Sequence, residues 1–165
     1  MGRWRPPTKQ GSPYITDEGA KRLRDELQYL WRTLRPEVVK ALSAAAAEGD
    51  RSENAEYTYR KKQLGGIDRR VRYLSKRIDI MKIVERPPAD TSIIRFGAYV
   101  TLHTSSEGQV EYRIVGVDET DANKGFISID SPVARALLGK IVGDSTEVKL
   151  PECSVRIEVI AVQYA

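Results

Sequence analysis

Apolar residues recur every three or four positions along the first third of the chain. This spacing is the repeat of a coiled-coil helix. The repeat comprises Ala20, Leu23, Leu27, Leu30 and Leu34. Thr16 precedes it and is predicted to cap the helix, which Val38 and Leu42 continue. Because Pro36 has no backbone N–H, we expect this helix to bend near Arg35.

A second apolar repeat follows after a short polar segment. It comprises Leu64, Ile67, Val71, Leu74, Ile78 and Met81. In the segment between the repeats, Gly49 is a helix terminator, and Asp50 with Glu53 has the spacing of a capping box that opens the next helix. Two matched repeats and a tight turn predict an antiparallel coiled-coil hairpin over residues 15–85. With about 30 residues per helix, the hairpin would extend roughly 45 Å, with Asp50 at its tip.

The pattern changes from helical to strand-like after residue 85. Residues 86–92 contain a proline pair and are predicted to be a linker. Alternating and β-branched positions then predict strands over 99–104, 109–115, 125–129, 146–150 and 154–162. Ser131 and Pro132 are predicted to begin one short helix that ends at Gly139. The predicted fold class is α+β, a helical hairpin followed by a small α+β domain over 93–165, with residues 1–14 as a disordered extension.

Composition excludes several classes of protein. The lone Cys153 cannot form an internal disulfide or a cysteine-rich zinc site. No apolar run approaches the roughly 20 residues of a membrane span, and the first residues lack the apolar core of a signal peptide. We therefore expect a soluble, cytoplasmic protein without a membrane partner.

Positive charge is concentrated in the first half of the chain. Residues 1–85 contain 19 Lys or Arg against 12 Asp or Glu, whereas residues 86–165 contain 8 against 11. Between Arg60 and Arg77, eight basic residues accompany one acid, Asp68. At about 100° per residue, four of the eight fall opposite the apolar repeat: Lys62, Arg69, Arg72 and Lys76. This ridge favours contact with a polyanion such as RNA or DNA, although a solvated coiled-coil surface is the alternative.

Tyrosines accompany this basic ridge. Tyr57, Tyr59 and Tyr73 could stack on bases, or they could pack within the hairpin.

Acidic residues crowd the predicted tip. Asp50, Glu53 and Glu56 recur every three residues. They would complement a helix dipole, with Asp50 and Glu53 as a capping box. Alternatively, two carboxylates would supply oxygen ligands to Mg²⁺, which keeps several waters and would need a second macromolecule to complete its site.

The second half of the chain shows no pattern of a catalytic site. His103 and Cys153 have no neighbouring residues in the sequence that would activate them, so this half is predicted to be a binding module.

Three segments together resemble a known family. GDRSENAEY, RKKQLGGIDRRVRYL and ISIDSPVARALLGK are similar to motifs of the Gre family of bacterial transcript-cleavage factors, the GreB branch in particular. The resemblance implies a coiled coil that enters the secondary channel of RNA polymerase and an FKBP-like domain that docks on the channel rim. It also implies that the chain is not itself an enzyme, but stimulates cleavage of the 3′ RNA in backtracked complexes by polymerase.

The resemblance assigns roles to individual residues. Asp50 and Glu53 would help to bind a magnesium ion in the polymerase active site and position the attacking water, and Asn54, Glu56 and Tyr57 would shape the tip. The residues implied to contact the RNA 3′ segment are Lys61, Lys62, Arg69, Arg70 and Arg72. The residues implied to dock on polymerase are Asp130, Ser131 and Pro132, of which Ser131 and Pro132 are equally a helix start.

The chain departs from the pattern of the family in two places. Gly65 and Gly66 interrupt the second helix where the family carries strong helix formers, and residues 1–14 have no counterpart in the family.

Three other functions compete with this interpretation. They are a channel-blocking inhibitor of polymerase, a peptidyl-prolyl isomerase suggested by the FKBP-like fold, and a nucleic-acid-binding coiled coil unrelated to polymerase. We expect the free protein to be monomeric.

Overall fold

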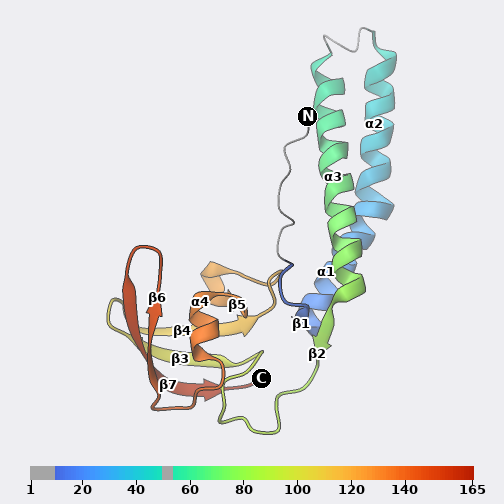
Figure 1. The fold of residues 1–165 in the computed structure, drawn as a ribbon. Helices are drawn as coiled ribbons and strands as arrows, with labels where there is room; N and C mark the ends of the chain where they lie inside the picture. Colours follow the sequence, from blue (N-terminus) through green and yellow to red (C-terminus); the bar gives the residue numbers. More distant parts are fainter. Residues whose placement is uncertain (1–9, 50–53) are drawn as a thin grey trace, which may run out of the picture. The chain divides into compact units, whose positions relative to one another are not determined.

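The computed structural model describes residues 10–49 and 54–165, which form two compact units. One unit is the helical hairpin, residues 20–81 (Figure 1). The other combines the described residues up to Gly19 with residues 82–165. The compact units thus divide at 19/20 and 81/82, whereas the sequence suggested domains over 15–85 and 93–165. None of the described helices has an apolar stretch long enough to cross a membrane.

The first arm of the hairpin is helical throughout but not uniform. It consists of α1 (Asp17–Tyr29), a π-helical segment η1 (Leu30–Leu34) and α2 (Arg35–Ala47). Thr16 caps α1 as predicted, because its hydroxyl oxygen accepts the N–H of Gly19 at 3.0 Å. The irregularity expected near Arg35 takes the form of η1, where the N–H of Arg35 bonds to the carbonyl of Leu30, five residues back.

The second arm is one unbroken helix, α3 (Ala55–Ile80), which runs alongside α2 (Figure 1). The predicted apolar repeats and their continuation supply most of the buried residues of the hairpin, namely Ala20, Leu23, Val38, Ile67 and Leu74. Ala45 and Arg77, which lie outside the repeats, are buried as well. Two ion pairs add to this packing. Arg35 Nε lies 2.8 Å from Asp68 Oδ1, and Arg70 binds both carboxylate oxygens of Glu26 at 2.6 and 2.8 Å. Since all four side chains are partly exposed, each pair contributes at most about 1 kcal/mol, and apolar burial dominates.

The C-terminal unit is built on a five-stranded mixed sheet with the order β5-β4-β3-β7-β6. Its strands are β3 (Tyr99–Thr104), β4 (Gly108–Val115), β5 (Phe126–Ser128), β6 (Ser145–Lys149) and β7 (Ser154–Gln163). All neighbours are antiparallel except β4 and β5, which are parallel. The five predicted strands and the α+β fold class are confirmed.

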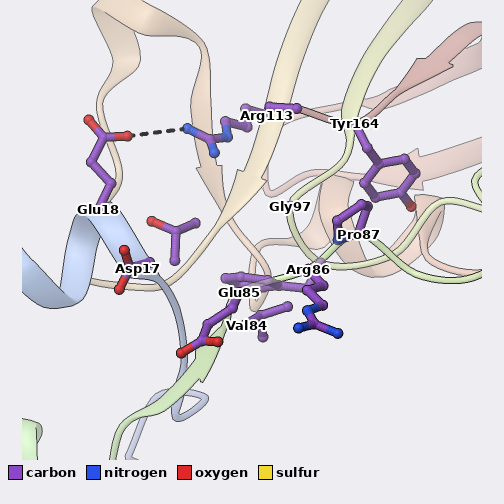
Figure 2. Close-up of a pocket in the computed structure, with 12 residues that line it drawn as sticks. Asp17, Glu18, Val84, Glu85, Arg86, Pro87, Gly97, Arg113 and Tyr164 are labelled. Atoms are coloured by element: carbon purple, nitrogen blue, oxygen red, sulfur yellow. Dashed lines mark ion pairs between the residues drawn. The ribbon is translucent and has the colours of Figure 1, made fainter.

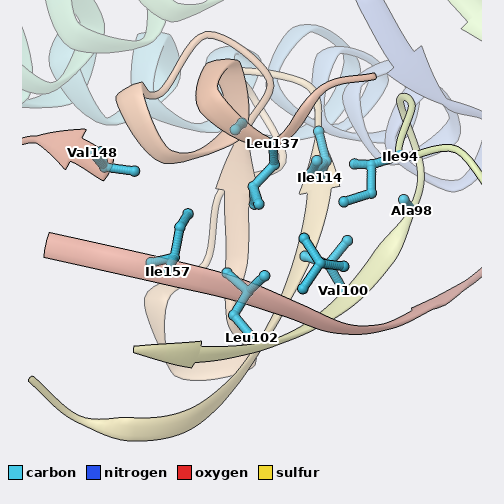
Figure 3. Close-up of a cluster of buried hydrophobic side chains, with 10 residues drawn as sticks. Ile94, Ala98, Val100, Leu102, Ile114, Leu137, Val148 and Ile157 are labelled. Carbon is cyan, nitrogen blue, oxygen red and sulfur yellow. The ribbon is translucent and has the colours of Figure 1, made fainter. Parts of the chain in front are cut away.

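One face of this sheet packs against a short helix, α4 (Pro132–Leu137). The hydroxyl oxygen of Ser131 accepts the N–H of Ala134 at 3.1 Å, so the predicted cap is confirmed. Figure 3 shows the resulting core, in which side chains of β3, β4, β6, β7 and α4 point toward one another. Its fully buried members include Ile94, Val100, Leu102, Ile114 and Leu137.

A small parallel sheet pairs β1 (Tyr14–Thr16) with β2 (Lys82–Val84). Just before β1, the backbone N–H and hydroxyl of Ser12 each donate to Asp130 at 2.7 Å. The prediction that residues 1–14 are disordered is therefore wrong for residues 12–14, because strand pairing and these hydrogen bonds order them. Residues 1–9 lie outside the described part of the chain.

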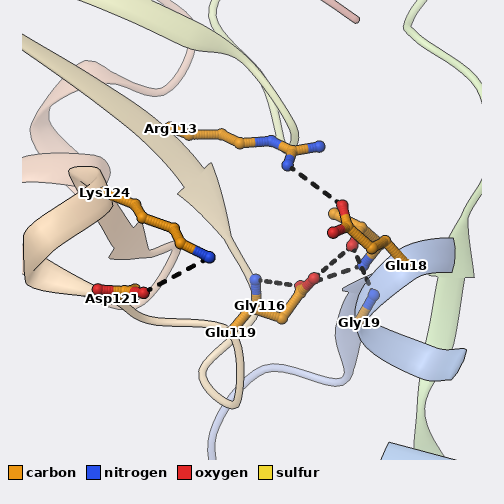
Figure 4. A network of polar contacts seen from close by, with 8 residues as sticks. Glu18, Gly19, Arg113, Gly116, Glu119, Asp121 and Lys124 are labelled. Atoms are coloured by element: carbon orange, nitrogen blue, oxygen red, sulfur yellow. Dashed lines mark hydrogen bonds and ion pairs between the residues drawn. The ribbon is translucent and has the colours of Figure 1, made fainter. Parts of the chain in front are cut away.

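A buried carboxylate fixes β1 and the start of α1 to the loop after β4 (Figure 4). Glu119 is 5% exposed and accepts the N–H of Thr16 at 3.1 Å, the hydroxyl of Thr16, and the N–H of Gly116 at 2.9 Å. Gly19 leaves the space that this carboxylate occupies, since a Cβ there would lie 2.1 Å from Glu119 Oε1. The loop continues into a 3₁₀ turn, η2 (Ala122–Lys124).

Candidate functional site

The two helix ends at the hairpin tip are tied together by Asn54. Its Oδ1 accepts the N–H of Tyr57 at 3.0 Å, which caps α3, and its Nδ2 donates to the carbonyl of Ala45 at 2.7 Å. The helix therefore begins at Ala55, and the prediction that Asp50 is its cap is wrong. Asparagine is as good a cap as aspartate, and here it also reaches the end of α2. Asp50 and Glu53 belong to the connection between these helix ends and lie outside the described residues.

The other two predicted tip residues have local roles in the first turn of α3. Glu56 forms an i,i+4 ion pair with Arg60 at 2.7 Å, and Arg60 also donates to Gln63 at 3.1 Å. The half-buried Tyr57 supplies the backbone N–H that Asn54 binds. Both residues therefore stabilise the end of the arm from which the tip connection starts.

The predicted metal ligands of the tip, Asp50 and Glu53, stay a prediction, because they lie outside the described residues. Within residues 10–49 and 54–165, no cluster of three His, Cys, Asp or Glu side chains is arranged to hold a metal ion. The two remaining tip carboxylates, Asp50 and Glu53, are hard oxygen donors of the kind that Mg²⁺ prefers. Two such ligands fill only part of an octahedral shell, so the rest would have to come from water or another macromolecule.

The basic ridge on α3 divides into paired and unpaired side chains. Arg70 is bound by Glu26, and the lone acid of the ridge, Asp68, is bound by Arg35. Lys61, Lys62, Arg69 and Arg72 are exposed. In the described part of the chain, none of these four lies within ion-pairing distance of a carboxylate. The structure thus distinguishes Arg70, which holds the two arms together, from the other four predicted RNA contacts.

Two of the three tyrosines singled out by sequence are on the surface. Tyr59 is 58% exposed and Tyr73 is 44% exposed, whereas Tyr57 is half-buried. An arginine guanidinium lies over each exposed ring, Arg60 over Tyr59 and Arg70 over Tyr73, both at 5.4 Å from the ring centre. Exposed rings beside cations are the features that bind unstacked bases.

The three predicted docking residues meet at the start of α4. Asp130 is held by Ser12 and lies 3.9 Å from Arg135, Ser131 caps the helix, and Pro132 is its first residue. These contacts within the chain explain why all three residues are present, without any contact to polymerase. Contact with polymerase therefore remains a prediction for them.

A cavity of about 300 Å³ lies in the C-terminal unit (Figure 2). Charged residues of both signs line it, including Asp17, Glu85, Arg86 and Arg113. Arg113 faces Glu18 at 3.9 Å, and its guanidinium lies over two rings, those of Tyr99 and Phe126. A proline pocket needs an apolar lining, which this charged cavity does not provide, so the cavity gives no support to an isomerase.

Sequence reasoning missed Glu119 and Arg113. Arg113 Nε is the one buried side-chain nitrogen or oxygen without a hydrogen-bond partner in residues 10–49 and 54–165. No local sequence pattern predicts the role of either residue, because their partners are far away in the chain. Glu119 binds Thr16, 103 positions away, and Arg113 faces Glu18. Both contacts arise from tertiary folding alone.

Family models match almost the whole chain. The model "Transcription elongation factor, N-terminal" matches residues 13–83, and "Transcription elongation factor, GreA/GreB, C-term" matches residues 89–164. Transcription elongation factor GreB of Xanthomonas axonopodis pv. citri is 58% identical over 166 residues, covering 100% of this chain and 99% of that protein. GreB of Pseudomonas aeruginosa is 51% identical, covering 99% and 98%. The crystal structure of GreA factor homolog 1 of Thermus thermophilus is 24% identical, covers 91% and 97% and has a TM-score of 0.42.

Proposed function

This chain belongs to the GreA/GreB family of transcription elongation factors, and from that premise we propose how its parts act on RNA polymerase. It is a non-catalytic factor that binds polymerase and stimulates transcript cleavage by it, as its GreB relatives indicate. Membership favours this function over a channel-blocking inhibitor, an isomerase or a free nucleic-acid-binding coiled coil. The expectation of DNA binding finds no support in the family or the relatives. We place the activity in the bacterial cytoplasm, with the factor acting as a monomer.

In our proposal the hairpin enters the secondary channel of polymerase. The observation that carries this step is the unbroken α3, whose 26 residues span about 39 Å. A rod only two helices thick, held together by apolar packing and two interhelical ion pairs, has a shape that suits insertion into a narrow channel. Its free end is the tip.

The tip then delivers Asp50 and Glu53. Asn54 holds the ends of α2 and α3 together, so the connection that carries both acids starts and ends at fixed points. In this position the two carboxylates would hold Mg²⁺ jointly with polymerase, and the ion would supply activation of the attacking water in phosphodiester hydrolysis. Glu56 and Tyr57 support the first turn of α3 behind them. The catalytic centre belongs to polymerase.

The predicted RNA contacts and docking residues are placed by the same insertion of the hairpin into the channel. Lys61, Lys62, Arg69 and Arg72 present positive charge along α3 to the extruded RNA 3′ segment, and Arg70 contributes at the edge of that face while bound to Glu26. The C-terminal unit docks on the channel rim through Asp130, Ser131 and Pro132. The contacts of Asp130 with Ser12 and of Ser131 with the N–H of Ala134 would give this docking surface a fixed shape.

The test uses polymerase complexes stalled in a backtracked state, with Mg²⁺, and follows RNA length with time. We expect wild type to shorten the RNA rapidly, and Asp50→Asn or Glu53→Gln to lower the rate at least tenfold while polymerase binding persists. Glu48→Gln is the matched control, since it removes one charge from an exposed acid just before the tip. Cleavage that is unaffected by either tip substitution would contradict the proposed role of the carboxylates.

A further inference from the structure

A groove of about 470 Å³ lies on one side of the helical hairpin, between α1 with η1 on one arm and α3 on the other. Its floor is aliphatic and half-buried, and is formed by Leu27, Val71 and Ile78. Trp31 lines the same groove and is 55% exposed. An exposed tryptophan beside open aliphatic side chains is typical of an interaction surface rather than of a solvated helix.

The indole of Trp31 is held in place by a neighbouring side chain. The guanidinium of Arg35 lies over the ring at 5.1 Å from its centre, and Arg35 is itself bound by Asp68 at 2.8 Å. Trp31 also belongs to the π-helical segment η1, and such segments occur frequently at functional sites. A large side chain that is fixed before binding loses little conformational entropy when a partner covers it. Trp31 is therefore suited to anchor a partner.

The charged side chains that line the groove are both arginines. Arg24 and Arg32 are exposed at its rim. Among residues 10–49 and 54–165, neither has a carboxylate within ion-pairing distance. Two cations without an acid in the lining complement a negatively charged partner.

The groove is separate from the basic ridge of α3 and lies far from the tip. At about 100° per residue, its α3 residues point roughly 140° away from the centre of that ridge. Because α3 continues without a break through Gly65 and Gly66, distances along it follow from the helical rise. Val71 and Ile78 lie about 24 and 35 Å along the axis from Ala55. The groove is therefore at the base of the hairpin.

We propose that this groove binds an acidic segment of RNA polymerase near the outer end of the secondary channel. An apolar side chain of that segment would cover the aliphatic floor and Trp31, while its carboxylates pair with Arg24 and Arg32. This inference rests on the proposed function, because a hairpin whose tip is inserted places its base toward the channel mouth. RNA fits the groove less well, since the aliphatic floor offers no ring for stacking and Arg35 already lies over Trp31.

The groove should contribute affinity rather than catalysis. Its contacts are the same before and during cleavage, so losing them raises the concentration of factor required and leaves the maximal rate unchanged. The tip acids are expected to behave in the opposite way, since their substitution lowers the maximal rate while binding persists.

The experiment measures cleavage in backtracked complexes against factor concentration and separates the half-maximal concentration from the maximal rate. We expect Trp31→Ala to raise the half-maximal concentration about tenfold, and Trp31→Phe, which keeps a ring, to raise it about threefold. The maximal rate should stay within about twofold of wild type. Tyr29→Ala is the matched control, because Tyr29 is 54% exposed on the same arm but does not line the groove.

A pair of charge reversals tests the electrostatic part of the proposal. Arg22 and Arg24 are both exposed on α1, about 160° apart around the helix, and of the two Arg24 lines the groove. Arg24→Glu should raise the half-maximal concentration about fivefold, and Arg22→Glu less than about twofold. Equal effects of the two reversals would assign the attraction to the overall charge of the hairpin and overturn the groove.

Replacing Trp31 by the photo-crosslinking residue p-benzoylphenylalanine identifies the partner. We expect crosslinks to a polymerase segment rich in Asp and Glu. Crosslinks to RNA or to a second copy of this chain, or no crosslink in an active complex, would each overturn the proposal. If wild type accelerates cleavage at no concentration, the proposed function itself fails. If wild type accelerates cleavage and Trp31→Ala matches it at every concentration, the groove alone fails.

Discussion

The buried carboxylate of Glu119 accepts three hydrogen bonds, from the N–H and the hydroxyl of Thr16 and from the N–H of Gly116. Replacing Glu119 by Ala leaves the N–H groups of Thr16 and Gly116 buried and unsatisfied. We expect Glu119→Ala to lower the free energy of unfolding by about 3 kcal/mol, measured by urea denaturation. Glu111→Ala, which removes an exposed acid from β4, should change it by less than about 0.5 kcal/mol. Equal losses in the two variants would contradict the role given to Glu119.

The phenol of Tyr164 makes stability depend on alkaline pH. Its hydroxyl donates to the carbonyl of Ile93 at 2.6 Å and accepts the N–H of Arg95 at 2.9 Å. Burial raises the pKa of Tyr164 above its ordinary 10.0. The folded state therefore holds this proton more tightly than the unfolded state, and the contribution is complete below pH 10 and is lost as pH rises through the folded pKa.

Unfolding titrations between pH 9 and 11.5 test this expectation. Wild type should lose stability over that range more steeply than Tyr164→Phe, which has no phenol at this position to titrate. The variant should also be about 1 kcal/mol less stable at pH 7, because the N–H of Arg95 and the carbonyl of Ile93 lose their partner. Parallel pH curves for the two proteins would count against the assignment.

At the scale of elements, the start of α3 depends on one side chain. Asn54→Ala removes both the cap on Tyr57 and the tie to Ala45, and we expect it to cost about 1–2 kcal/mol and to speed amide exchange at Tyr57. Asn54→Asp keeps an acceptor for Tyr57 but cannot donate to Ala45. In Asn54→Asp, the Tyr57 amide should therefore exchange as slowly as in wild type, while the rate of transcript cleavage should still fall. Normal cleavage by Asn54→Asp would show that the tie is dispensable.

The bounds of helices and strands could be predicted from the sequence where several residues in a row followed the same hydrophobic or capping pattern. Every long strand of the C-terminal unit followed from alternation, and Ser131 followed from its place before a proline. The pair β1 and β2 was not predictable, because three residues show no period and the parallel partners are far apart in the chain. The start of α3 was misplaced because Asp50 and Asn54 are equally good caps by type, and only the carbonyl of Ala45 distinguishes them.

At the scale of the whole molecule, the site is spread along an arm rather than gathered in a pocket. Asp50 and Glu53 were found from spacing and resemblance, and their role stays a prediction, because both lie outside the described residues. Helical phase correctly placed the basic face on the surface. The resemblance added Arg70 to the RNA contacts, and neither it nor helical phase could reveal the pairing with Glu26, which depends on how the two arms pack.

The contact between Gly19 and Glu119 has a consequence for how this sequence can change over evolutionary time. A side chain at position 19 is excluded only while a glutamate occupies position 119, because the two compete for the same volume. The substitutions are therefore coupled: Gly19→Ala should be harmful alone and far better tolerated once Glu119 has become smaller. In an alignment of relatives, positions 19 and 119 should covary, although 100 residues separate them in the chain.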